Sequence, residues 1–154
     1  MISTADLYDE HIETVRVLTP KLASFGGRTQ FSGVIATVKC FEDNSRVKEA
    51  VGEPGDGRVL VVDAGGSLRC ALLGDRVASA AIGNGWAGVV MYGCVRDARE
   101  LATMDLGVLA LSTSPRKSTR RDEGVRDVAV RFHDVTFEPG HTLYADEDGV
   151  VVLP

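Results

Sequence analysis

The sequence predicts an α/β fold with a parallel sheet at its centre and a β-rich C-terminal part. Two observations carry this prediction. The middle of the 154-residue chain alternates apolar, strand-like runs with helix-like segments, and the chain beyond residue 127 holds only short strand-like runs between turns. The hydrophobic fraction of 44% and the charged fraction of 25% are typical of a globular protein, and the length suits one domain. We therefore expect a single domain over residues 1–154.

The first third of the chain predicts two helices and one strand. Ser3 can cap a helix that runs to about His11. After a glycine turn at 25–28, residues 33–40 alternate β-branched and small side chains, which is typical of a strand. Asn44 can cap a second helix that reaches about Val51, and the composition of residues 53–57 predicts a loop.

The middle of the chain predicts three strands with two helices between them. The run VLVVD has no polar face until its last residue, which indicates a strand buried on both sides, as in parallel sheets. The predicted order is a strand at 59–63, a helix at 74–82, a strand at 87–92, a helix at 97–104 and a strand at 107–111. This alternation implies right-handed βαβ crossovers.

The C-terminal part predicts a polar loop followed by short strands. The loop covers residues 112–124 and contains a basic run from Pro115 to Arg121. A solvated loop is one interpretation of this run, and a contact with a subunit or an anion is the other. The expected strands are 128–132, 135–137, 142–144 and 150–153.

Composition excludes several classes of protein. A net charge of −5 argues against a general nucleic-acid binder, which needs a basic surface. Because no apolar run is as long as a membrane span and no signal sequence opens the chain, we expect a cytoplasmic protein without a membrane partner. The cysteines, Cys40, Cys70 and Cys94, form no CxxC pair and are expected to be small buried hydrophobic residues.

Candidate site residues follow the predicted strands. Because ligands bind beyond the carboxyl ends of strands in α/β sheets, the segments 64–67, 74–77 and 96–97 could converge on one crevice. The segment 64–67 lacks the G-x-G-x-x-G pattern, so it gives no support to a nucleotide site or a methyltransferase. We expect it to be a tight connection whose amides face the crevice.

One spacing in these segments suggests a metal and a 2-oxo acid. Asp75 is followed after twenty residues by Arg96 and Asp97, and Glu100 comes three residues after Asp97. Asp97 and Glu100 would share a helix face, which suits Mg²⁺. Arg96 can grip a carboxylate with two hydrogen bonds, and the helix start at Gly74 can offer free N–H groups. The alternative is purely structural: an N-cap, a first-turn acid and a surface carboxylate.

Long strings of the chain resemble the RraA-like family, which contains the regulator of ribonuclease activity A and the class II 4-hydroxy-4-methyl-2-oxoglutarate aldolases. The matching strings include FGGRTQFSG, VLVVDAGGSLRCALLGD, NGWAGVVMYGCVRD, DLGVLALSTSPRKSTRR and YADEDGVVV. The resemblance implies a swivelling β/β/α fold with the βαβ core described above. It also implies a homo-oligomer, usually a trimeric ring and sometimes a dimer of trimers.

The resemblance also implies roles for the spaced residues, because the aldolase signature of the family is complete in this chain. Asp97 would bind a divalent metal, Mg²⁺ or alternatively Mn²⁺, and Arg96 would hold the substrate and stabilise a pyruvate enolate. Asp75 would position a water for proton transfer, and Glu100 would hold waters around the metal. The residues that would line the substrate site are Gly74, Asp75, Arg76, Val77 and Arg96.

Two functions of different classes are implied by the resemblance. The first is a divalent-metal-dependent class II aldolase that cleaves 4-hydroxy-4-methyl-2-oxoglutarate to pyruvate and also decarboxylates oxaloacetate through the same pyruvate enolate. The second is a regulator that binds and inhibits an endoribonuclease, for which an acidic surface would suit an arginine-rich partner.

Overall fold

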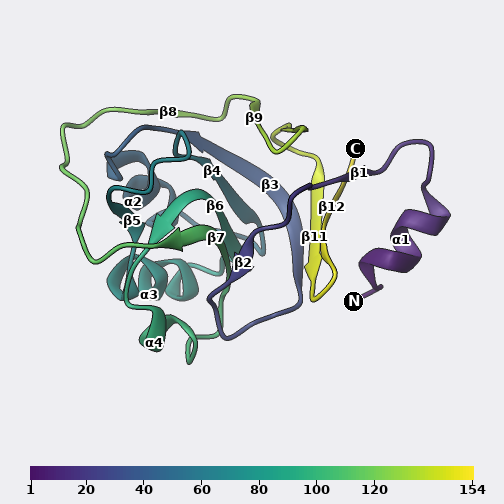
Figure 1. Cartoon of the computed structure of the whole chain (residues 1–154), viewed down its shortest axis with the longest axis horizontal. Coiled ribbons are helices and arrows are strands. Elements are labelled where there is room, and N and C mark those ends of the chain that lie inside the picture. Colours follow the sequence, from purple (N-terminus) through teal and green to yellow (C-terminus); the bar gives the residue numbers. More distant parts are fainter.

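The computed structural model describes residues 1–154 and has a mixed α/β fold (Figure 1). Its helices are α1 (Thr4–Glu10), α2 (Ser45–Val51), α3 (Asp75–Gly83) and α4 (Ala98–Leu101). Its strands are β1 (Arg16–Val17), β2 (Ala23–Ser24), β3 (Phe31–Lys39), β4 (Val59–Asp63), β5 (Ala71–Leu73), β6 (Gly88–Val95), β7 (Gly107–Thr113), β8 (Val125–Arg126), β9 (Val130–Phe132), β10 (Val135–Phe137), β11 (Thr142–Asp146) and β12 (Gly149–Leu153).

One curled sheet organises the molecule. Its main strand order is β1-β12-β11-β3-β4-β6-β7-β2, and it bends into a half-barrel (Figure 1). The four central strands β3, β4, β6 and β7 are parallel, whereas β11, β12, β1 and β2 pair with their neighbours antiparallel. Strand β5 lies parallel to the end of β6, and β9 and β10 form a separate hairpin. The predicted parallel centre and β-rich C-terminal part are confirmed.

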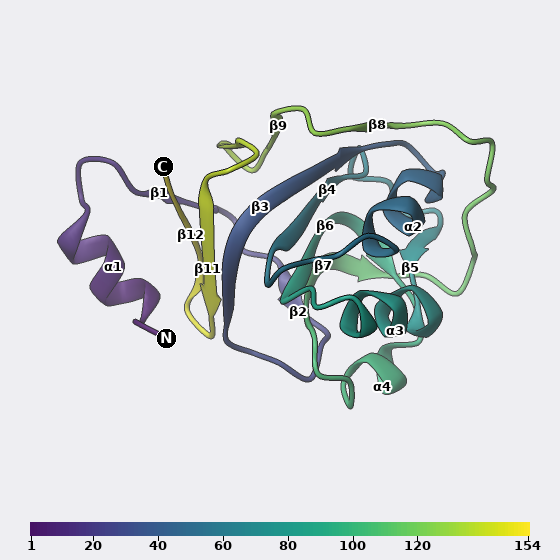
Figure 2. The same ribbon diagram turned by 180° about the vertical axis from the view of Figure 1, so that it is seen from behind.

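Apolar cores lie on both faces of this sheet. Helices α2, α3 and α4 gather on one side, as Figure 2 shows, over a core of 22 buried residues that includes Val47, Ala78 and Leu101. The opposite side has a second core of 17 residues, to which β9 and β10 contribute Phe132 and Phe137. Helix α1 packs on β12 through a smaller cluster. No helix is long and apolar enough to cross a membrane.

Several predicted elements are confirmed in detail. The run VLVVD is β4, with its first four residues buried, and it pairs in parallel with β3 and β6. Ser3 caps α1 by accepting a hydrogen bond from the Asp6 amide at 3.1 Å. All three cysteines are buried and free, as the sequence predicted.

Other elements differ from the prediction. The helix expected over 97–104 is only the single turn α4: Asp97 is its N-cap with a left-handed backbone (φ 61°), and residues 102–104 form a turn and a bend rather than a further helical turn. Asn44 precedes α2 but does not cap it through its side chain. Strand β5 was not predicted: it is only three residues long and its sequence continues directly into the next helix. The two-residue strands β1, β2 and β8 are too short to show a period.

Candidate active site

A cleft of about 1010 Å³ opens where β5, the start of α3, the end of β6 and the segment 116–120 meet. The structure brings together on its walls six of the residues that the sequence singled out: Gly74, Asp75, Arg76, Val77, Arg96 and Asp97. Two of the three expected segments, 74–77 and 96–97, therefore converge on one cavity.

Asp97 joins two walls of this cleft. Strand β6 ends at Val95, and the Arg96 amide donates to the Leu73 carbonyl of β5 at 2.9 Å. The next residue, Asp97, adopts the left-handed conformation that aspartate tolerates better than most residues. Its Oδ2 accepts a hydrogen bond from the Asp75 amide at 2.9 Å. The end of β6 is thus fastened to the beginning of α3.

Gly74 permits this close approach. A Cβ atom at position 74 would lie 2.6 Å from Oδ2 of Asp97 and 3.3 Å from Cγ of Arg96. Because a real Cβ contact is longer than 3.0 Å, a side chain here would push the Asp97 carboxylate away. The backbone of Gly74 is extended (φ −131°), a conformation that any residue can adopt. Glycine is therefore required here for lack of space and not for its backbone conformation.

The start of α3 offers unpaired donors to the cleft. The N–H groups of Arg76 and Val77 belong to the first helical turn and donate no hydrogen bond within the protein. Together with the positive end of the helix dipole, such groups favour an anion. The sequence prediction that the 74–77 turn has free amides agrees with this geometry, except that the Asp75 amide is occupied by Asp97.

Two predicted contributors lie outside the cleft. Glu100 is exposed on α4 and does not line the cavity formed within one chain. The expectation that the amides of 64–67 face the crevice is wrong. The amides of Ala64 and Gly66 donate to the Tyr92 carbonyl at 3.2 and 3.1 Å, and the Gly65 amide donates to Oδ1 of Asp63 at 3.0 Å.

The sequence did not assign Asn44 or the segment 116–120 to the site. This segment forms the wall opposite α3, which we call the basic wall: Arg116, Lys117, Ser118, Thr119 and Arg120. It is tied to β5, because the Ala71 amide donates to the Arg116 carbonyl at 2.7 Å and the Ser118 amide donates to the Ala71 carbonyl at 3.2 Å. The basic run was the signal, and its anion-contact interpretation is the one this placement favours.

Asp43 fastens the far end of the basic wall. Its carboxylate is buried and accepts hydrogen bonds from the amides of Ser45 at 2.8 Å, Arg121 at 2.6 Å and Glu123 at 3.3 Å. Burial on its own would raise the pKa of Asp43, but these hydrogen bonds outweigh burial and lower the pKa to about 2. The carboxylate is therefore ionised at neutral pH, and it anchors the chain at the end of the basic wall through the amides of Arg121 and Glu123.

The cleft carries an excess of unpaired positive charge. Its walls present the cations Arg76, Arg96, Arg116, Lys117 and Arg120 against the carboxylates of Asp75 and Asp97. None of these residues takes part in any of the six ion pairs of the molecule. In a chain with net charge −5, this local excess creates a field that attracts small anions.

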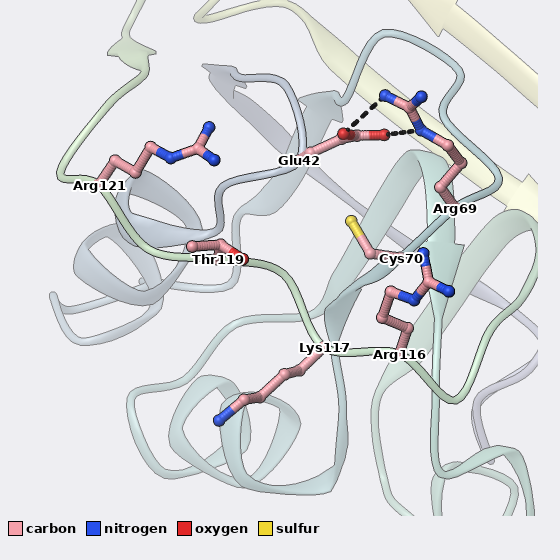
Figure 3. Close-up of a pocket in the computed structure, with 7 residues that line it drawn as sticks. All are labelled: Glu42, Arg69, Cys70, Arg116, Lys117, Thr119 and Arg121. Atoms are coloured by element: carbon pink, nitrogen blue, oxygen red, sulfur yellow. Dashed lines mark hydrogen bonds and ion pairs between the residues drawn. The ribbon is translucent and has the colours of Figure 1, made fainter.

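A smaller cavity of about 280 Å³ adjoins the cleft (Figure 3). It shares Arg116, Lys117 and Thr119 with the basic wall. Figure 3 shows the guanidinium of Arg69 beside Glu42, where two of its nitrogens donate hydrogen bonds to the two carboxylate oxygens. Burial raises the pKa of the Cys70 thiol in this cavity. A thiol with a raised pKa is a poor nucleophile, so Cys70 is a packing residue.

The donor set of the cleft fits a hard divalent cation. Only one oxygen of Asp97 accepts a hydrogen bond, so its other oxygen is available as a ligand. No three His, Cys, Asp or Glu side chains are assembled as a metal cage. Mg²⁺ needs only one or two carboxylates, because it keeps several waters and takes oxygens from its substrate. Asp97 beside an open cleft matches that requirement.

Comparisons with known proteins identify the family. The family described as RraA-like, Aldolase/RraA, matches residues 4–152. A protein of Alkalilimnicola ehrlichii named "Putative 4-hydroxy-4-methyl-2-oxoglutarate aldolase" is 58% identical over 151 residues, which cover 98% of this chain and 94% of the relative. A protein of the same name from Laribacter hongkongensis is 57% identical over 151 residues, covering 98% and 95%.

Two solved structures superpose almost completely on the chain. The RNA-processing inhibitor RraA from Thermus thermophilis has a TM-score of 0.97 at 45% identity, covering all of this chain and 93% of the other. A protein of Geobacillus kaustophilus named as an S-adenosylmethionine:2-dimethylmenaquinone methyltransferase has a TM-score of 0.97 at 49% identity, covering 99% and 94%. With its fold, its cleft and these matches, the chain belongs to the RraA-like aldolase family.

Proposed function

We propose that this protein is a divalent-metal-dependent aldolase that cleaves 4-hydroxy-4-methyl-2-oxoglutarate and also decarboxylates oxaloacetate. The observation that carries the proposal is the placement of Arg96 and Asp97 beside the unpaired amides of α3 in one cationic cleft. The names of the Alkalilimnicola and Laribacter relatives support the substrate.

Both reactions need the same stabilisation. In aldol cleavage the C3–C4 bond of the substrate breaks, the C4 hydroxyl loses its proton to become a carbonyl, and the bonding pair remains on C3 as the enolate of pyruvate. In oxaloacetate the bond to the C4 carboxylate breaks, carbon dioxide leaves, and the same enolate remains. Protonation at C3 then gives pyruvate. A site that stabilises the enolate oxygen therefore lowers the barrier to both reactions.

The residues of the cleft divide this work. The guanidinium of Arg96 lies where it can hold the 2-oxo acid by its carboxylate and oppose negative charge on the enolate oxygen. The free N–H groups of Arg76 and Val77 supply further hydrogen bonds to the same anion. Asp75, which is exposed at the start of α3 and lines the cleft, would orient a water that takes the hydroxyl proton.

Asp97 would hold the cation, for which Mg²⁺ is the proposed ion and Mn²⁺ the alternative. A bound divalent cation supplies Lewis-acid chemistry at the 2-oxo group. The hydrogen bond from the Asp75 amide fixes the orientation of the Asp97 carboxylate. We propose that Glu100, which is exposed on α4 outside the cleft, holds waters around the cation.

The methyltransferase name of the Geobacillus relative is not carried over to this chain. A nucleotide-like cofactor would need the loop after β4 to present free amides, and the amides of Ala64, Gly65 and Gly66 are all engaged.

The test is pyruvate formation from both substrates, with Mg²⁺ and with a chelator, in the unmodified protein and in Asp97→Ala and Arg96→Ala. We expect chelator-sensitive turnover that falls by at least about a hundredfold in each variant, as for the loss of a charge-stabilising group. Asp97→Asn separates charge from backbone, because asparagine also tolerates the left-handed conformation. Turnover that ignores the chelator and both substitutions would contradict the proposal.

A second candidate function is that of a protein regulator of an endoribonuclease. The 45% identity and TM-score of 0.97 to the RNA-processing inhibitor from Thermus thermophilis favour it. The test is inhibition of a purified endoribonuclease by this protein. Asp97→Ala should leave that inhibition intact while it abolishes turnover, whereas a regulator that works through the cleft would lose both.

A further inference from the structure

We propose that the cleft holds a second carboxylate subsite on its basic wall, formed by the guanidinium of Arg120 and positioned by Asn44. The inference rests on the proposed aldolase function and deepens it, because it names what selects a substrate with two carboxylates. The ligand class is a 2-oxo acid that carries its second carboxylate at the far end from the 2-oxo group.

Asn44 orients Arg120 through a defined pair of hydrogen bonds. Nε of Arg120 donates to Oδ1 of Asn44 at 2.9 Å, and Nδ2 of Asn44 donates to the Leu72 carbonyl at 3.1 Å. An arginine can only donate and a carbonyl can only accept, so just one orientation of the amide satisfies both partners. Because Asn44 is only 8% exposed, it is held by packing as well.

This arrangement leaves the terminal guanidinium nitrogens of Arg120 free to bind a ligand. Its side chain makes no hydrogen bond other than the one from Nε, so both terminal nitrogens are unpaired. A guanidinium fixed at Nε and free at its terminal nitrogens can still form hydrogen bonds with both oxygens of a carboxylate. Arg120 also lacks any ion pair, although it lines the cleft.

The neighbouring Arg69 provides a contrast within the same surface. Its guanidinium is closed on Glu42 through Nε at 2.6 Å and a terminal nitrogen at 2.8 Å, as Figure 3 shows. Arg69, outside the cleft, thus has a carboxylate partner within the protein, whereas Arg120, inside the cleft, has none. This difference indicates that the carboxylate for Arg120 comes from a ligand.

Strand β5 anchors both ends of the cleft. The Leu72 carbonyl holds Asn44, and the carbonyl of the adjacent Leu73 holds the amide of Arg96. The backbone of Arg96 and, through Asn44, the guanidinium of Arg120 are therefore both anchored on β5. A fixed separation between two carboxylate-binding groups favours diacids of one length.

The experiment compares two substrates that undergo the same bond cleavage. 4-Hydroxy-4-methyl-2-oxoglutarate has the second carboxylate, and 4-hydroxy-2-oxopentanoate lacks it. We expect Arg120→Gln to lower kcat/KM for the diacid about tenfold to a hundredfold more than for the monoacid, mainly through KM, as for the loss of a charged hydrogen-bond pair. Lys48→Gln is the control: it removes one charge from an exposed side chain of α2 outside the cleft, and kcat/KM should stay unchanged for both substrates.

Asn44 is tested as a positioning residue. Asn44→Ala should shift the diacid-to-monoacid ratio in the same direction, and it should add nothing in an Arg120→Gln background. If Asn44 had only a structural role, Asn44→Ala would lower kcat/KM equally for both substrates. Its effect would then add to that of Arg120→Gln. If Asn44→Ala does not fold, Arg120→Lys replaces it: a lysine keeps the charge but has no Nε to meet Asn44, so the ratio should still fall.

The outcomes separate this inference from the function on which it rests. Cleavage of both substrates by the unmodified protein with an unchanged ratio in Arg120→Gln overturns the second subsite and leaves the aldolase standing. An equal loss on both substrates also overturns it, because that result describes a general loss of positive field. No cleavage of either substrate overturns the aldolase, and the subsite falls with it.

Discussion

The charges around α2 and the charges of the cleft are arranged in opposite ways. Around α2, Arg46 and Arg126 are each bridged to two carboxylates, which are drawn from Glu49, Glu53 and Asp122. In the cleft, five cations face two carboxylates and no ion pair forms. The two regions are adjacent, because α2 begins directly after Asn44.

This difference separates charges that serve structure from charges that serve a ligand. A cation with an internal carboxylate partner has little left to offer an anion. Cations kept close together without partners repel one another, so the fold must hold them in place by other means. Here the means are backbone ties to β5 and the carboxylate of Asp43. The comparison predicts that cleft substitutions change activity and that α2 substitutions change only stability.

The largest expected effect comes from Gly74→Ala. The new Cβ would lie 2.6 Å from Oδ2 of Asp97, so the carboxylate must move and its hydrogen bond to the Asp75 amide must lengthen. We expect turnover of oxaloacetate to fall by about a hundredfold, the scale of a displaced charge-stabilising group. The thermal midpoint should change little, because the displaced atom is at the end of a side chain.

Gly83→Ala is the matched control for this change. Gly83 lies in the same helix, and a Cβ there meets nothing within 4 Å. It should leave turnover as it is and should not lower the thermal midpoint, because alanine is the better helix former. Equal loss of turnover in both variants would mean that α3 itself, rather than the Asp97 carboxylate, is what the substitution disturbs.

The success of the sequence prediction follows the strength of the local pattern. Strand β4 and the parallel pairing of β3, β4 and β6 could be predicted, because long apolar runs leave few alternatives. The placement of Arg96 and Asp97 beside Gly74 followed from the rule that ligands meet the carboxyl ends of strands.

What the sequence did not predict depends on contacts distant in the chain. Asn44 appeared to be a helix cap, but its partners are Leu72 and Arg120, 28 and 76 residues away. No local pattern encodes such pairs. The basic wall was visible as a cluster of charges, yet only its ties to Ala71 place it over the cleft.

Glu100 illustrates a local pattern that the backbone modifies. Its spacing from Asp97 predicts a shared helix face, and that prediction assumes a helix that includes Asp97. Asp97 instead has a left-handed backbone and is the N-cap of α4, which begins at Ala98 and is four residues long. Aspartate is frequent at helix starts and tolerates the left-handed conformation better than most residues, so the residue type excluded neither arrangement.

A smaller effect, on stability and on the basic wall together, is expected for Asp43→Asn. The pKa of Asp43 is about 2 in the folded protein against 3.8 ordinarily, which corresponds to about 2 kcal/mol of folding free energy at neutral pH. Because the folded pKa is the lower one, this contribution is present above about pH 4 and is lost as the pH falls towards 2. Urea unfolding, followed through the single buried Trp86, measures it.

The variant and the unmodified protein should therefore differ by about 2 kcal/mol at pH 7 and converge near pH 2. Asp56→Asn is the control, because Asp56 is exposed and its side chain makes no hydrogen bond. A difference between unmodified protein and Asp43→Asn that stays constant from pH 7 to pH 2 would show that ionisation of Asp43 is not what holds the wall.

The smallest effect is expected on the other side of the comparison, for Arg126→Gln. The substitution removes ion pairs to Glu49 and Glu53, whose side chains are 47% and 48% exposed, so their loss costs little. It also removes Nε of Arg126, a buried donor without a partner, and this removal is favourable. The two contributions oppose each other, and we expect the free energy of unfolding to change by under about 1 kcal/mol.

Turnover should be unchanged in Arg126→Gln, because none of the ion-paired residues around α2 lines the cleft. Unfolding in urea and oxaloacetate kinetics on the same preparation test both expectations. A double variant with Glu53→Gln measures the coupling of the pair, which should be under about 1 kcal/mol. A loss of turnover without a loss of stability would show that the two groups of charges are coupled. The ion pairs around α2 would then have to position Asn44 through that helix. In that case the distinction between structural charges and ligand-binding charges would not hold at α2.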